Sequence, residues 1–138
     1  MNIFDVVNEL SVLCVTLLMM AVSTIWYSSW MFGDIWMREA KITNESISPS
    51  KSDMFRKTLL TFFCYFCMTM CFAYIVAVAP QLHLSLKAIN LFLIVFVGAL
   101  LGPVSIWEQK TLRYFLVSIG FMSVFITLGL SILASWPW

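Results

Sequence analysis

The chain has 138 residues, of which 62% are hydrophobic and only 11% are charged, and its mean hydropathy is +0.94. Soluble domains carry about a quarter charged residues, so this composition excludes an ordinary soluble domain and indicates a protein embedded in lipid. The net charge of +1 gives no electrostatic reason to bind nucleic acid, and we expect no nucleic-acid partner.

Four apolar segments follow one another along the chain, over residues 10–31, 58–79, 88–107 and 112–136. Each reaches the ~20 residues that a helix needs to cross the hydrocarbon core of a bilayer. The connections after the second and third segments are short, which makes sequential helices antiparallel neighbours. The sequence therefore predicts an all-α fold: a single transmembrane domain, residues 1–138, built as an integral membrane four-helix bundle.

The basic residues are divided unequally between the two sides of this bundle. Five lie in the long loop 33–57 and two follow the third segment, whereas Lys87 alone lies between the second and third segments. Cytoplasmic loops are enriched in Lys and Arg. We therefore expect loop 33–57 to be cytoplasmic and both termini to be non-cytoplasmic.

Small and weakly polar residues mark the faces on which membrane helices pack, because packing drives their association in lipid. The third segment repeats Asn90, Ile94, Gly98 and Gly102, and the fourth carries Gly120, Ser123, Thr127 and Ser131. We expect these faces to meet in a four-helix core. The Gly98–Gly102 pair is a GxxxG motif that either packs within the chain or forms a subunit interface.

Sulfur-containing side chains gather in the second segment, where Cys64, Cys67 and Cys71 accompany Met68. Soft sulfur ligands would suit Cu(I), but a single helix cannot easily converge three thiolates on one ion. We interpret the cysteines as small buried hydrophobic residues. His83, the only histidine, lies in the predicted turn between the second and third segments, so we expect no metal and no cofactor.

Catalytic patterns are missing from the sequence. No histidine lies inside the predicted bundle to serve a nucleophile, no carboxylates are paired at membrane depth, and no glycine-rich phosphate loop occurs. We therefore expect no catalytic residues and do not expect an enzyme.

Aromatic residues crowd the end of the first segment, in the stretch from Trp26 to Trp36. Gly33 lets the chain leave the helix there, because glycine tolerates backbone angles that other residues resist. Glu108 arrives at the same depth from the third segment and needs hydrogen-bond donors. We predict a clasp in which Glu108 bonds Tyr27, Trp36 or Arg38; the alternative is an aromatic belt with Glu108 in solvent. The predicted clasp comprises Trp26, Tyr27, Phe32, Gly33, Trp36, Arg38, Trp107 and Glu108.

Part of this stretch resembles a known family. Trp26-Tyr27-Ser28, Phe32-Gly33 and Trp36 are similar to the W-Y-S-x-x-x-F-G-x-x-W signature of the small bacterial membrane proteins grouped as domain of unknown function 1761. The resemblance implies a four-helix integral membrane protein of the bacterial cytoplasmic membrane and no particular reaction.

A second landmark of that family is an aromatic-Glu pair before a basic turn and the last helix. Trp107-Glu108, followed by Lys110, Arg113, Phe115 and Gly120, resembles it. The chain departs from the family's pattern in having Ser29 where proline is usual and Gly120-Phe121-Met122 where Gly-Tyr-His is usual. No role for that Tyr-His pair can be transferred to this chain.

The sequence thus favours a structural or accessory membrane protein, either alone or as a subunit of a larger membrane complex, and indicates no biochemical activity. Its expected partners are membrane lipid and either other copies of itself or other membrane subunits. The alternative is an oligomeric membrane channel or carrier. Since four spans enclose too little interior for a pore, conduction would need several copies around a common axis.

Overall fold

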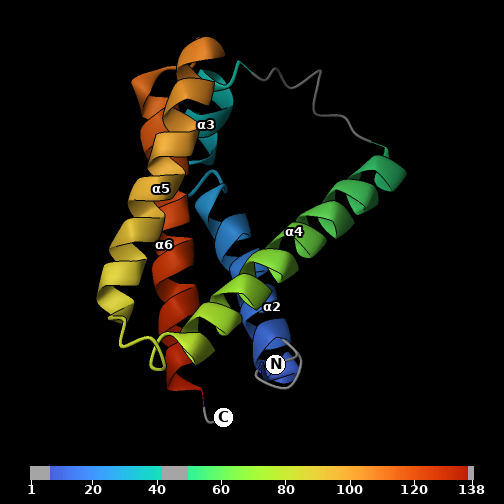
Figure 1. Ribbon diagram of the computed structural model, residues 1–138. Helices are drawn as coiled ribbons and strands as arrows, with labels where there is room; N and C mark the ends of the chain where they lie inside the picture. Colours follow the sequence, from blue (N-terminus) through green and yellow to red (C-terminus); the bar gives the residue numbers. More distant parts are fainter. Residues whose placement is uncertain (1–6, 42–49, 137–138) are drawn as a thin grey trace.

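The computed structural model describes residues 7–41 and 50–136. All regular secondary structure in this part of the chain is helical (Figure 1). The helices are α2 (Glu9–Trp26), α3 (Gly33–Glu39), α4 (Lys51–Val78), α5 (Leu86–Trp107) and α6 (Leu112–Ser135). α2, α4, α5 and α6 are long and apolar enough to cross a membrane. The predicted all-α fold with four membrane-spanning helices is confirmed.

Side-chain caps define where three of the long helices begin. Asn8 accepts a hydrogen bond from Ser11 N, Ser50 from Asp53 N and Thr111 from Tyr114 N, each at 3.2 Å. Such bonds satisfy backbone N–H groups that have no partner in the first turn of a helix. These short polar residues therefore set the helix starts, whatever the hydropathy of the residues that follow.

The helix bounds differ from the predicted spans on the side of the long loop. α2 ends at Trp26 rather than at residue 31, and both α3 and the first turns of α4 lie inside the predicted loop 33–57. Hydropathy marks where a chain enters lipid, but Lys and Arg are good helix formers, so α4 extends beyond its apolar part. Residues 42–49 of the predicted loop lie outside the described residues.

Three of the long helices form the core, and the others pack around it (Figure 1). α2, α4 and α6 contact one another, α5 packs against α6, and α3 packs against the start of α6. The first turn of α2, the last turn of α6 and the α4–α5 connection lie at one end of the bundle, and α3 lies at the other. We call these the termini end and the α3 end.

The centre of the bundle is filled by aromatic and aliphatic side chains rather than by the predicted small-residue faces. Phe121 and Phe125 of α6 are at most 2% exposed, as is Met19 of α2. The Phe125 ring lies 4.9 Å from that of Tyr65 and 6.1 Å from that of Phe72, both edge-to-face. Large rings from α6 therefore fill the space between α2 and α4, and α5 stays outside this core.

The glycines expected to mediate helix packing have three different environments. A Cβ atom at Gly120 would lie 3.2 Å from the Trp26 ring, and one at Gly98 would lie 3.4 Å from Ile119 of α6. A Cβ atom at Gly102 would meet no atom within 4 Å. Within the chain, the GxxxG motif thus uses Gly98 for contact with α6 and leaves Gly102 open.

The polar residues expected in the core of α6 lie at its edge or outside. Ser123 is half-buried and its hydroxyl donates to the Ile119 carbonyl at 2.8 Å. Thr127 and Ser131 are exposed, and Asn90 of α5 donates to the Thr127 hydroxyl at 3.2 Å. These side chains therefore belong to the junction between α5 and α6 and to the outer surface beside it.

The four cysteines are exposed, which corrects the interpretation that they are buried. The buried face of α4 is formed by Thr69, Phe72, Ala73 and Val76. At 100° per residue, Cys64, Cys67 and Cys71 lie on the opposite face of this helix. Their thiols therefore point away from the core of the single chain.

Candidate functional site

A tight turn joins α2 to α3, and it depends on the absence of a side chain at Gly33. Phe32 N donates to the Trp26 carbonyl at 3.1 Å, and Gly33 N donates to the Ser28 carbonyl at 2.9 Å. A Cβ atom at residue 33 would overlap the carbonyl oxygen of Tyr27 and lie 2.7 Å from that of Ser28. Gly33 does not have a positive φ. Glycine is needed here for space and not, as we predicted, for its backbone freedom.

Trp26 packs this turn against α6. Its ring lies 4.6 Å from the ring of Phe32 and 6.2 Å from that of Phe121, and Gly120 gives it room on α6. Its indole N–H is buried and has no hydrogen-bond partner among the described residues. The ring is therefore held by packing rather than by polar contacts.

A row of aromatic rings continues from α6 to α3. The Tyr27 ring lies 5.3 Å from that of Phe121 and 5.4 Å from that of Trp36, and Trp36 stacks on Tyr114 at 6.1 Å. Aromatic pairs at such separations stabilise by about 0.5–1.5 kcal/mol beyond the area they bury. The predicted residues Trp26, Tyr27, Phe32, Gly33 and Trp36 are thus brought together in one cluster.

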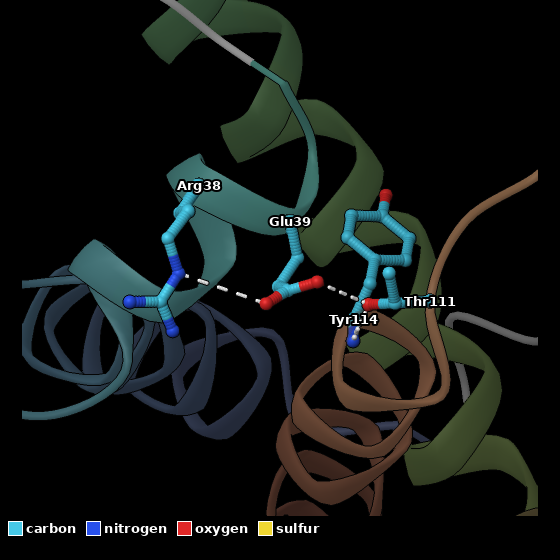
Figure 2. Close-up of polar contacts among 4 residues, drawn as sticks. All are labelled: Arg38, Glu39, Thr111 and Tyr114. Carbon is cyan, nitrogen blue, oxygen red and sulfur yellow. Dashed lines mark hydrogen bonds and ion pairs between the residues drawn. The ribbon is translucent and has the colours of Figure 1, made fainter.

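The acidic residue at the centre of the polar contacts is Glu39, the last residue of α3 (Figure 2). Thr111 donates through its hydroxyl to Glu39 Oε2 at 2.6 Å, and Glu39 Oε1 lies 3.6 Å from Arg38 Nε. Glu39 is 14% exposed in its side chain, whereas Arg38 is 66% exposed. The hydrogen bond between Thr111 and Glu39 therefore contributes more to stability than the ion pair between Arg38 and Glu39, because exposed ion pairs contribute little.

The position of the Glu39 carboxylate also matches the charge distribution of α6. Thr111 is the N-cap of that helix and accepts from Tyr114 N while donating to Glu39. The N-terminal end of a helix carries a partial positive charge, so a carboxylate beside it is stabilised. A carboxylate from α3 and the cap of α6 thus hold the two helices together.

Lys110 makes a second connection between the same elements. Its ammonium donates to the Ala40 carbonyl at 3.4 Å and lies 5.5 Å from the centre of the Tyr114 ring. A cation over an aromatic face is attracted by the ring's quadrupole. Lys110 therefore links the end of α3 to the first turn of α6, beside the contact made by Glu39. We call Gly33, Trp36, Glu39, Lys110, Thr111 and Tyr114 the α3 clasp.

Glu108 and Trp107, which we predicted in the clasp, lie outside it. Trp107 is 87% exposed and Glu108 is exposed as well. Glu108 forms no hydrogen bond or ion pair with Tyr27, Trp36 or Arg38, all of which are described. The prediction that Glu108 is the central carboxylate is therefore wrong, and Glu39 occupies that position instead.

The turn after α5 explains this difference. Gln109 has a φ of 54°, and the backbone N–H groups of Gln109 and Lys110 donate to Ile106 and Ser105 at 3.1 and 2.9 Å. This is the Schellman arrangement, in which the residue after the C-cap adopts a left-handed conformation. The turn directs Lys110 and Thr111 toward α3 and leaves Glu108 on the outside.

Sequence reasoning missed Glu39 and Thr111, although a signal for each was present. Thr111 directly precedes the apolar run of α6, the position of an N-cap. Glu39 ends a seven-residue helix that the sequence shows only as a mixed-charge stretch. The N-cap pattern could have identified Thr111, whereas the partner of its hydroxyl depends on the path of the chain in space.

The side chains of the clasp are engaged mainly in contacts between helices. Over residues 7–41 and 50–136, no group of three or more His, Cys, Asp or Glu side chains could hold a metal ion. The clasp offers one carboxylate, one ammonium and a row of rings, all engaged with one another. Its geometry therefore suits a structural element that fixes α3 against α6.

Comparison with known protein families gives a match over most of the chain. The model of the family described as "Protein of unknown function (DUF1761)" matches residues 10–134. The chain belongs to this family, as its signature residues indicated. Comparisons with curated proteins and with solved structures find no match. In this chain, the residues of the first signature form the turn and ring cluster next to α3.

Proposed function

We propose that this integral membrane protein has a structural or accessory, non-enzymatic role as a subunit of a larger membrane assembly. The observation that supports the proposal is the polar surface beside the α5–α6 junction. Thr127 and Ser131 are exposed there, within a helix apolar enough to span a bilayer, and Asn90 is half-buried. A second subunit covering this surface would remove these groups from lipid.

The hydrogen-bonding capacity of Asn90 is only partly used within the chain. Its amide donates one hydrogen bond to Thr127 at 3.2 Å, and its oxygen accepts one from the same hydroxyl at 3.3 Å. An asparagine amide has two N–H donors and an oxygen with two lone pairs. Unused polar capacity in a membrane helix is commonly satisfied by a neighbouring helix, so Asn90 is suited to bond a partner subunit.

The shape of the surface also suits a partner's side chains. A groove of about 300 Å³ between α5 and α6 is lined by Lys87, Asn90, Thr127 and Ser131, among others. Small residues at such junctions allow another helix to approach closely. A partner helix could place polar side chains in this groove and cover the junction.

A site-specific photocrosslinker at position 127, with the full-length protein in its native membrane, tests the proposal. We expect crosslinks to a defined protein at position 127 and none at position 96, because Phe96 is 50% exposed and apolar and suits lipid. Mass spectrometry of the adduct would show whether the partner is a second copy or another subunit. Crosslinks to lipid alone at both positions would contradict the proposal.

An oligomeric channel or carrier is the second candidate, and one feature favours it. Ser123, Thr127 and Ser131 recur every four residues along α6, so several copies meeting at this surface would surround their common axis with hydroxyl groups. Purified protein in vesicles would then conduct ions or release a trapped solute, and Thr127→Leu would reduce the flux. An assembly of copies without flux would favour the structural role.

The seven-to-one division of basic residues supports an orientation with the α3 end in the cytoplasm, in the cytoplasmic membrane of a bacterium. Single cysteines at Ser50 and His83 in a cysteine-free variant would test it in intact cells. An impermeant thiol reagent should label position 83 and not position 50. The reverse labelling would overturn the orientation.

A further inference from the structure

The first turns of α4 are unlike the rest of that helix, because nothing in the described chain covers them. Every residue from 51 to 60 is exposed, and α4 diverges from the other helices toward this end (Figure 1). The exposed residues include large apolar side chains: Met54 is 62% exposed and Phe55 is 71% exposed. This segment therefore needs a surrounding that accepts both apolar and charged groups.

The apolar side of the segment continues the core-facing side of the same helix. Phe55, Phe62, Thr69 and Val76 recur every seven residues and so lie along one face. Thr69 and Val76 are buried, Phe62 is half-buried and Phe55 is exposed. The face that packs against the bundle at the termini end thus loses its protein partner step by step toward the α3 end.

The charged residues of the segment are distributed around the helix. At 100° per residue, Asp53 and Lys57 fall opposite Phe55 and Phe62, whereas Arg56 lies on the flank of that face and Lys51 lies beside it. Over residues 51–57, the bases Lys51, Arg56 and Lys57 outnumber the acid Asp53, which gives a net charge of +2. Arg56 and Lys57 form no side-chain hydrogen bond or ion pair with any described residue. The segment is therefore a basic stretch of helix with unengaged cations and exposed apolar side chains.

The length of α4 places this segment at the membrane surface. Its 28 residues at ~1.5 Å each extend roughly 42 Å, more than the roughly 30 Å of a hydrocarbon core. Charged side chains are costly inside that core. Upright or tilted, the helix must place Lys51, Asp53, Arg56 and Lys57 among the lipid head groups.

We propose that residues 51–60 of α4 form a lipid-binding surface, in which Arg56 and Lys57 bind anionic phospholipid head groups while Met54 and Phe55 lie among the upper acyl chains. A cluster of Lys and Arg beside the end of a membrane-spanning helix is attracted to anionic lipid head groups, and long cationic side chains can extend to the head groups while apolar neighbours stay in the acyl chains. The observation that selects lipid as the occupant is charge complementarity. This inference goes beyond the proposed subunit role and concerns a different surface.

The lipid preference of the full chain in vesicles tests the proposal. Spin-labelled phosphatidylglycerol and phosphatidylcholine measure which lipid is held at the protein surface. We expect a preference for phosphatidylglycerol that falls by roughly fivefold or more in the double variant Arg56→Gln, Lys57→Gln. The matched control, Lys41→Gln with Arg113→Gln, removes two exposed cations from the same end and should retain most of the preference. An unchanged preference in the first variant, or equal losses in both, would overturn the proposal.

A depth measurement keeps the test independent of the charge variants. A fluorescent label on a single cysteine at position 55, in the cysteine-free chain, should be quenched by lipids brominated near the head of the acyl chain, and a label at position 56 by a water-soluble quencher. If the label at position 55 responds instead to protein-to-lipid ratio, a second copy covers this face and the proposal fails. Equal access of both labels to water would also refute it.

Discussion

α5 and α6 are antiparallel neighbours of similar length and equal mean hydropathy, yet they have different places in the molecule. α6 has seven buried residues, whereas Ser105 is the one buried residue of α5. The large rings Phe121 and Phe125 of α6 point between α2 and α4, while Phe92 and Phe96 of α5 are exposed. Hydropathy therefore shows that a helix enters lipid and does not show whether it is central or peripheral.

The most severe test of this comparison replaces one phenylalanine on each helix. Phe125→Ala removes a ring that is 1% exposed, and we expect a loss of about 3–5 kcal/mol in the free energy of unfolding. Phe96→Ala on α5 should cost less than about 1 kcal/mol, because the ring is exposed. Unfolding in micelles with increasing SDS, followed by circular dichroism, measures both. Equal losses would show that α5 is as central as α6.

A second test concerns the fixing of α3 to α6. Gly33→Ala would force a Cβ atom against the carbonyl groups of Tyr27 and Ser28, and overpacking of this kind costs about 1–3 kcal/mol. Gly102→Ala on α5 is the control, since a Cβ atom there meets nothing within 4 Å. We expect the control to unfold like the unmodified protein. A stable Gly33→Ala variant would mean that the turn can relax without loss.

The third test compares two glutamates near the turn that connects α5 to α6. Glu39→Ala removes the acceptor for the Thr111 hydroxyl and should destabilise the protein by about 1–2 kcal/mol. Glu108→Ala should change the free energy of unfolding by less than about 0.5 kcal/mol, since its side chain is exposed. Thermal unfolding of the two variants in one detergent gives the comparison. A larger loss for Glu108→Ala would restore Glu108 as the central carboxylate.

The smallest expected effect concerns the turn that joins the two helices. Gln109 has a φ of 54°, a conformation that glycine adopts more readily, so Gln109→Gly should stabilise the protein by roughly 0.5–1 kcal/mol. Gln81, in the turn between α4 and α5, does not have a positive φ, and Gln81→Gly should give no gain. Melting temperatures in detergent distinguish the two variants. A gain at both positions would point to an effect unrelated to backbone conformation.

The fold could be predicted from the sequence because long uncharged apolar runs have few alternatives to a membrane helix. The end of α2 and the start of α4 could not, since helix caps and the Gly33 turn act independently of hydropathy. The small-residue pattern was a weak guide to the core. Gly120 and Gly98 meet a neighbour, but Gly102 has no atom within 4 Å of a Cβ position, and Thr127 and Ser131 are exposed. In this chain, large rings on α6 determine the centre.

For the candidate site, the sequence predicted the ring cluster and missed its carboxylate. Tyr27, Gly33 and Trp36 are close in the chain, so a local turn brings them together. Glu39 and Thr111 are 72 residues apart, and Glu108 was an equally reasonable partner until the path of the α5–α6 turn was known. Contacts between distant residues depend on helix orientation, which a single sequence does not contain.

The long separation between Glu39 and Thr111 has a consequence for synthesis in the cell. α2 packs against both α4 and α6, whereas α3 packs against α6, the last helix to emerge. At roughly 5 to 20 residues per second, the 72 residues between the two partners take roughly 4 to 14 s to translate. During this interval α3 lacks its contacts with α6, so in a chain truncated before α6 we expect α3 to be exposed to proteolysis even where α2 packs against α4.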